Sequence, residues 1–217
     1  MNKPALVKID FVSDVSCPWC AIGLKALEQA IARIGDGLEV ELHFQPFELN
    51  PQMPAEGEDT AEHLTRKYGS TAEQLAANRE AIRARGAALG FTFNQRDRIY
   101  NTFDAHRLLH WAGLESRPRE LALKNALLRA YFTDGDDVSS HANLIRIAAD
   151  AGLDAERARG ILESGEYTEE VRLQEQRYLA SGIHSVPAVI INDRHLISGG
   201  QPVEIFERAL RQIASAS

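Results

Sequence analysis

The hydrophobic pattern changes its period at a Cys-X-X-Cys sequence near the N-terminus, and this change constrains the fold more than any other feature. Residues 6–12 alternate apolar and polar side chains, which is typical of a strand with one buried face. From Pro18 the apolar residues are instead spaced three and four apart, which predicts a helix that ends near Gly35. Cys17 is therefore expected at the N-terminus of a helix that directly follows a strand.

The rest of the chain is expected to complete a small sheet around a long helical segment. Residues 38–47 alternate again and predict a second strand, parallel to the first because β-α-β crossovers are right-handed. Residues 48–59 are rich in Pro, Gly and acids and indicate a linker. Helical patterns then dominate up to residue 180, and two strands and a helix that begins at Pro202 follow. We predict an α/β protein in which residues 1–52 and 181–217 form one discontinuous domain and residues 53–180 a helical insertion.

The charge balance argues against two kinds of partner. The 217 residues have a formal net charge of -7 at pH 7, so they offer no basic excess for nucleic acid or an anionic membrane. The N-terminal residues lead straight into the first strand, without an apolar stretch of signal-peptide or membrane-span length. We expect a cytoplasmic protein that binds neither nucleic acid nor membrane.

Cys17 and Cys20 are the two cysteines of the chain, and their spacing indicates redox chemistry. A structural disulfide over so short a loop would remove little entropy from the unfolded chain. At a helix N-terminus, the exposed N–H groups and the helix dipole stabilise a thiolate. We expect Cys17 to be the nucleophile and Cys20 to resolve a mixed disulfide at Cys17. Pro18 suits the first helical position because its missing N–H would be unpaired there, and Trp19 supplies an apolar rim.

Two other interpretations of the cysteine pair stay open. The cysteines could be small buried hydrophobic residues, or half of a zinc site that needs two further ligands. Among the seven histidines, His106 and His110 alone have a ligand-like spacing, and a helix with a solvated face explains that pair as well. We favour the redox interpretation and predict no metal site.

A second candidate region, Ser185-Val186-Pro187, stands directly before a predicted strand. A cis proline at this place would leave the backbone of Val186 free to pair with an extended peptide. Only about 5–6% of X-Pro bonds in folded proteins are cis, so these residues alone favour an ordinary trans proline at the start of a strand.

Taken together, these stretches resemble the DsbA superfamily of thioredoxin-fold proteins, and most closely its FrnE-like branch. The resemblance covers nearly the whole chain and rests on residues 13–20, 101–107, 130–132, 182–187 and 198–202. It implies a thioredoxin fold in which the helical insertion caps the active-site face, and a cis Pro187 beside the cysteines.

The resemblance also implies that Asn101, His106 and Arg107 line the groove between cap and thioredoxin domain. Helix capping and surface ion pairing explain the same three residues, and we slightly favour that explanation.

The chain departs from the superfamily pattern at two positions. Periplasmic DsbA proteins have a histidine where this chain has Trp19, and an indole cannot add a positive charge beside the first cysteine. Many thioredoxin-like enzymes keep a buried acid where this chain has Phe11, and Asp10 is expected to face the other way. Deprotonation of Cys20 must then depend on water or another group, and Asp14, if close, would oppose thiolate formation.

These observations predict a thiol-disulfide oxidoreductase that acts through Cys17 and Cys20 on a disulfide- or thiol-containing protein or small molecule. We expect no bound cofactor, with glutathione as a candidate co-substrate. A cytosolic setting and the missing histidine favour reduction or isomerisation over strong oxidation. The sequence gives no indication of the oligomeric state.

The alternative enzyme class is a glutathione-dependent isomerase or transferase. The resemblance extends to 2-hydroxychromene-2-carboxylate isomerases and kappa-class transferases, which typically place a serine where this chain has Cys17. A peptide-binding module beside Pro187, with incidental cysteines, is the least favoured hypothesis.

Overall fold

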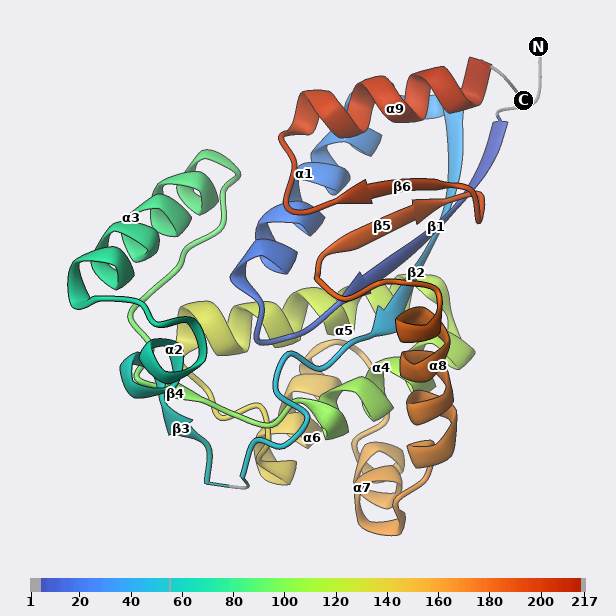
Figure 1. The fold of residues 1–217 in the computed structure, drawn as a ribbon. Coiled ribbons are helices and arrows are strands. Elements are labelled where there is room, and N and C mark those ends of the chain that lie inside the picture. Colours follow the sequence, from blue (N-terminus) through green and yellow to red (C-terminus); the bar gives the residue numbers. More distant parts are fainter. Residues whose placement is uncertain (1–4, 55, 216–217) are drawn as a thin grey trace.

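A four-stranded sheet brings the two ends of the chain together. The computed structural model describes residues 5–54 and 56–215 (Figure 1). The strand order is β2-β1-β5-β6, with β1 parallel to β2 and antiparallel to β5, and β5 antiparallel to β6. The strands are β1 (Ala5–Ser13), β2 (Leu38–Pro46), β5 (Ala188–Ile191) and β6 (His195–Ser198). The predicted β-α-β and β-β-α units therefore form one mixed sheet.

Two helices, α1 (Pro18–Ile34) and α9 (Val203–Ser215), pack against each other beside the sheet (Figure 1). Each has an apolar stripe whose central members are fully buried, as Leu27 is in α1 and Phe206 in α9. α1 ends at Gly35, as predicted, because that residue takes a positive φ of 64°. α9 begins one residue after the predicted Pro202.

The segment between β2 and β5 is mainly helical, as predicted. α4, α5 and α8 contact β2, whereas α3 contacts α1. The helices are α2 (Thr60–Tyr68), α3 (Ala72–Ala88), α4 (Phe103–Glu115), α5 (Arg117–Arg129), α6 (His141–Asp150), α7 (Ala155–Ser164) and α8 (Thr168–Ala180). In the described part of the chain, no helix combines the length and apolarity that a membrane crossing requires.

Two local features of this segment were not predicted. The chain widens into a π-helical turn at Ala130–Asp134, directly after α5. The two-residue strands β3 (Glu58–Asp59) and β4 (Arg98–Ile99) pair with each other, so the predicted linker at residues 48–59 ends in a strand. Two-residue strands are too short for a hydrophobic period to reveal them.

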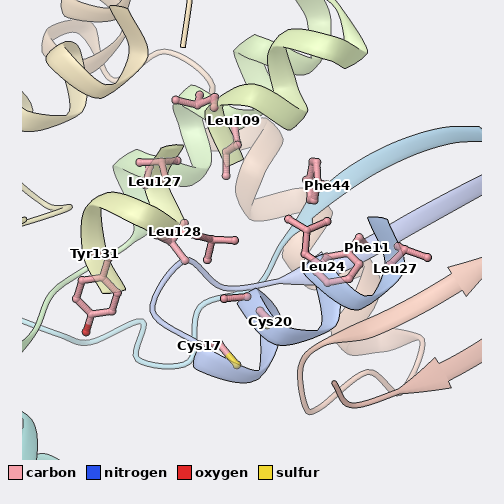
Figure 2. Packing of buried hydrophobic residues seen from close by; sticks show 14 of the residues in the cluster. Phe11, Cys17, Cys20, Leu24, Leu27, Phe44, Leu109, Leu127, Leu128 and Tyr131 are labelled. Carbon is pink, nitrogen blue, oxygen red and sulfur yellow. The ribbon is translucent and has the colours of Figure 1, made fainter. Parts of the chain in front are cut away.

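One continuous hydrophobic cluster joins the sheet, α1 and the helical segment (Figure 2). Phe11 of β1 and Phe44 of β2 meet edge to face, with ring centroids 5.8 Å apart. Leu127 and Leu128 of α5 belong to the same cluster, and so does the fully buried Cys20. This core contains residues of both predicted domains. The domain boundaries at residues 52 and 180 therefore stay predictions.

Candidate active site

Cys17 and Cys20 occupy the first turn of α1. Cys17 is the N-cap residue, with an extended backbone (φ -90°, ψ 114°), and Pro18 begins the helix. The backbone N–H of Cys20 donates to the carbonyl oxygen of Cys17 at 3.1 Å. Both side chains are free thiols, and Figure 2 shows them below Leu128. Cys17 is 4% exposed and Cys20 is not exposed at all, so Cys17 is the thiol that borders the surface.

The Val186-Pro187 segment lies against Cys17. Its peptide bond is cis, and the Sγ of Cys17 lies 3.8 Å from the carbonyl oxygen of Val186. The N–H of Gly199 donates to the carbonyl oxygen of Pro187 at 2.8 Å, which ties this segment to the residues after β6. The two candidate regions of the sequence therefore form one site.

Two glycines, to which the sequence analysis gave no role in packing, let α1 approach this segment closely. A Cβ on Gly23 would lie 3.1 Å from Cγ of Pro187, and a Cβ on Gly200 would lie 2.8 Å from the carbonyl oxygen of Trp19. Glycine inside a helix costs about 0.5–1 kcal/mol relative to alanine, so Gly23 needs a packing reason, and the contact with Pro187 supplies it. A glycine within a helical pattern was the available signal.

Trp19 and Arg85 lie together beside the cysteines. The guanidinium carbon of Arg85, on α3, lies 5.3 Å from the centroid of the Trp19 ring, and its Nη2 donates to the carbonyl oxygen of Gly200 at 2.9 Å. Tyr68, at the end of α2, is 60% exposed. Partial burial raises the pKa of Tyr68, and negative charge on Cys17 raises it further. α2 and α3 thus add one aromatic ring and one cation to the surroundings of Cys17, beside the Trp19 ring of α1.

Asp14 is a fully buried acid in the loop before Cys17. Its carboxylate accepts hydrogen bonds from the N–H and Oγ of Ser16, at 3.2 and 3.0 Å, and from the N–H of Leu49, at 2.7 Å. His106 Nε2 lies 3.5 Å from Asp14 Oδ1, within ion-pair distance but without hydrogen-bond geometry. Burial alone would raise the pKa of Asp14, but His106 and the Leu49 amide lower it to about 2. Asp14 is therefore ionised at neutral pH, and its hydrogen bonds hold the loop.

Phe11 and Asp10 lie as the alternation of β1 predicted. Phe11 belongs to the hydrophobic cluster that includes Cys20. The Asp10 carboxylate instead contacts Lys8 Nζ at 2.9 Å and accepts a hydrogen bond from Gln45 Nε2 at 2.6 Å. Asp10 therefore has its own partners and does not take the place of the buried acid that many thioredoxin-like enzymes have at the position of Phe11.

The sequence analysis missed Lys124 of α5, a basic residue whose charge bears on the pKa of Cys20. Lys124 is fully buried. Burial and the neighbouring Cys17 raise the pKa of Cys20 well above its ordinary value, and the charge of Lys124 works in the opposite direction. Lys124 stands in the helical spacing of the buried Leu123, Leu127 and Leu128, and a charged residue on an apolar stripe was the available signal.

Of the three polar residues expected near the groove, His106 alone approaches the cysteine loop. Asn101 Oδ1 accepts from the backbone N–H two residues later at 2.9 Å, so it stabilises the turn that leads into α4, directly before the N-cap residue Thr102. Arg107 donates to the carbonyl oxygens of Glu166, at 2.7 Å, and of Ile161, and holds α4 against the end of α7. Arg107 also forms an ion pair with Asp104 at 2.6 Å, as expected, but its side chain is buried, because this carboxylate and the carbonyl oxygens satisfy its donors. Among the described residues, no group of three or more His, Cys, Asp or Glu side chains could hold a metal ion.

Comparison with known proteins identifies the family. Residues 8–211 match the family model of the DSBA-like thioredoxin domain. The chain belongs to this family. The predicted thioredoxin fold with a helical insertion and the resemblance to the DsbA superfamily are therefore confirmed, and a DSBA-like oxidoreductase is its general class.

Three proteins illustrate the relatives of this DSBA-like chain. The crystal structure of probable DsbA oxidoreductase SCO1869 from Streptomyces coelicolor is 36% identical with a TM-score of 0.89, and the match covers 97% of this chain and 91% of that chain. Uncharacterized protein YwbO of Bacillus subtilis (strain 168) is 28% identical over 206 residues, 94% of this chain and 96% of that protein. A 2-hydroxychromene-2-carboxylate isomerase shares the fold with a TM-score of 0.69 at 15% identity, over 97% of this chain and 99% of that chain.

Proposed function

We propose that this chain catalyses thiol-disulfide exchange, with Cys17 as the nucleophile and Cys20 as the resolving thiol. One observation carries the proposal: the Cys17 thiol stands at the N-terminus of a 17-residue helix, 3.8 Å from the carbonyl oxygen of Val186, with Cys20 one turn further along. The N-terminus of a helix stabilises an anion placed there, and the thiolate is the reactive form of cysteine.

The reaction proceeds through a mixed disulfide. The Cys17 thiolate attacks one sulfur of a substrate disulfide, a bond forms between the two sulfurs, and the second substrate sulfur leaves as a thiolate. Cys20 then loses its proton and attacks Cys17 Sγ, so that the Cys17–Cys20 disulfide forms and the first substrate sulfur is released. Two electrons pass from the cysteine pair to the substrate. A dithiol, or two molecules of a small thiol, returns them.

The surroundings of Cys17 suit a peptide or a small thiol such as glutathione as the substrate. Trp19 and Tyr68 offer aromatic surface, and the Arg85 guanidinium offers a charge for a carboxylate. The cysteine pair itself holds the electrons, so the proposal needs no bound cofactor. We place the reaction in the cytoplasm, where thiol pools favour reduction or isomerisation of the substrate.

The test is to trap the mixed disulfide. With Cys20→Ser, a disulfide-containing peptide or oxidised glutathione is expected to accumulate on Cys17, as an increase in intact mass that a reductant reverses. Cys17→Ser is expected to trap nothing. If Cys20→Ser instead keeps full turnover with glutathione while Cys17→Ser loses it, the chain is a glutathione-dependent isomerase or transferase.

A further inference from the structure

A wholly buried amine lies next to the reactive cysteines. Lys124 is fully buried on α5, and among the described residues its Nζ has no hydrogen-bond partner. The Nζ lies 5.6 Å from the centroid of the Phe44 ring. Burying an unpaired ammonium is costly, and lysine is one of the residues least often buried without a partner. Its position therefore calls for a reason other than stability.

Lys124 lies among residues of the hydrophobic cluster that contains Cys20, since Leu123, Leu127, Leu128 and Phe44 belong to that cluster. Lys124 lies one helical turn before Leu128, and Figure 2 shows Leu128 over the cysteines. The acids in electrostatic range of Lys124 are Cys20, Asp14, Cys17 and Glu120. Both carboxylates already have partners, because Asp14 accepts from the Leu49 N–H and Glu120 accepts from the Phe44 N–H at 3.0 Å and from Arg117 at 2.9 Å. Cys20, whose side chain is fully buried, is therefore the acidic group that Lys124 would stabilise when it ionises.

The imidazole of His106 is a second basic group near Lys124. Lys124, His106 and His110 line a small cavity between β2, α4, α5 and α8, and Nε2 of His106 is also buried without a hydrogen bond. Two buried basic nitrogens without a hydrogen bond among the described residues therefore come from residues that line this cavity, and of the two, His106 Nε2 is the one at ion-pair distance from Asp14.

The shifts expected for the two groups agree with a proton transfer between them. Burial raises the pKa of Cys20 and lowers the pKa of Lys124, and the charge of each partner reduces the other's shift. The proton affinities of thiol and amine therefore move toward each other.

We propose that Lys124 is the proton acceptor and charge partner of Cys20 in the resolving step. This inference rests on the proposed function, since Cys20 needs a base only if it attacks a mixed disulfide. The Cys20 thiol and the neutral Lys124 amine become a thiolate and an ammonium. The thiolate attacks Cys17 Sγ, the mixed disulfide breaks, and the departing substrate thiolate takes up the proton that Lys124 then releases. Lys124 thereby replaces the acid that many thioredoxin-like enzymes place where this chain has Phe11.

The test uses Lys124→Met, which keeps the length of the side chain and removes the amine. In a Cys17→Ser background, the ultraviolet absorbance of the Cys20 thiolate is followed against pH. We expect Lys124→Met to raise the pKa of Cys20 by about one unit or more, which lowers its thiolate fraction about tenfold. Lys25→Met, which removes an ion pair with Glu28 on α1 whose side chains are about a quarter exposed, is the matched control and is expected to leave the titration unchanged.

A second readout is the rate at which a preformed mixed disulfide between Cys17 and glutathione resolves in a single turnover. Lys124→Met is expected to slow it about tenfold below the pKa of Cys20 and to move its pH profile upward. A folded Lys124→Met protein with an unchanged Cys20 titration overturns the inference, whether or not the wild type turns over. Absence of exchange in the wild type, with a shifted Cys20 titration, overturns the proposed function alone.

Discussion

The Sγ of Cys17 lies 3.8 Å from the carbonyl oxygen of Val186, although 169 positions of the sequence separate the two residues. The pairing of β1 with β5 brings them together, because Cys17 follows the end of β1 and Val186 precedes the start of β5. The site is thus a property of the sheet, and changes that disturb the approach of α1 to Pro187 are expected to affect it.

Gly23→Ala tests that close approach. The added Cβ would lie 3.1 Å from Cγ of Pro187 and 3.4 Å from Cα of Gly200, so the neighbours must shift. We expect the free energy of unfolding, measured in urea, to fall by about 1 kcal/mol or more, together with the exchange rate. Gly160→Ala, inside α7 with nothing within 4 Å of the added Cβ, is the control and should stabilise by about 0.5–1 kcal/mol. Equal gains from both substitutions would show that the contact with Pro187 is not tight.

Arg85→Ala tests the link between α3 and the cysteine region. It removes the stacking on Trp19 and the hydrogen bond to the Gly200 carbonyl, and we expect a loss of about 1 kcal/mol in urea unfolding, with a change in Trp19 fluorescence. Arg83→Ala, on the same helix, removes an exposed ion pair with Glu80 and should leave both measurements unchanged. If the two variants behave alike, Arg85 does not anchor α3 here.

Asp14 is expected to make the free energy of unfolding fall at acidic pH. Its pKa falls from 3.8 in the unfolded chain to about 2 in the fold, so the native state holds this proton less tightly. The contribution, about 2 kcal/mol, is complete above pH 3.8 and is lost as the pH falls through about 2. Asp14→Asn is expected to abolish this loss of stability in acid and to lower the free energy of unfolding at pH 7 by a similar amount. The exposed Asp150→Asn serves as control, and an unchanged acid profile for Asp14→Asn would contradict the account.

Lys124→Met is expected to stabilise the reduced protein. Because burial lowers the pKa of Lys124, the unfolded chain binds this proton more readily than the fold, and the wild type loses stability as the pH falls below 10.5. At neutral pH the free energy of unfolding of the variant, measured in urea, should exceed that of the wild type by more than about 1 kcal/mol, since methionine suits an apolar site. A variant less stable than the wild type across the pH range would mean that Lys124 supports the fold itself.

The sequence predicted the frame of the site better than its interior. The change of hydrophobic period at Pro18 placed Cys17 at a helix N-terminus, and the alternation of β1 turned Asp10 away from Cys20, because both depend on local geometry. The place of Pro187 beside Cys17 followed from the family resemblance, since no local pattern reports a contact across 169 positions.

Lys124 and Arg107 show where local patterns fail. Both are charged residues in helices, and such residues are usually solvated. Only the packing of α5 against β2 and of α4 against α7 reveals that they are buried. The partners that satisfy Arg107, and the absence of a hydrogen bond to Lys124 Nζ among the described residues, arise from tertiary contacts that one sequence does not encode in its spacing.

The most direct test of the central claim is equilibration of the protein across glutathione redox buffers, followed by alkylation and intact mass. The account predicts one reversible two-electron transition between the dithiol and a Cys17–Cys20 disulfide, accompanied by a change in Trp19 fluorescence and lost in Cys17→Ser. Absence of a Cys17–Cys20 disulfide at every ratio of reduced to oxidised glutathione would contradict thiol-disulfide exchange as the function of this chain.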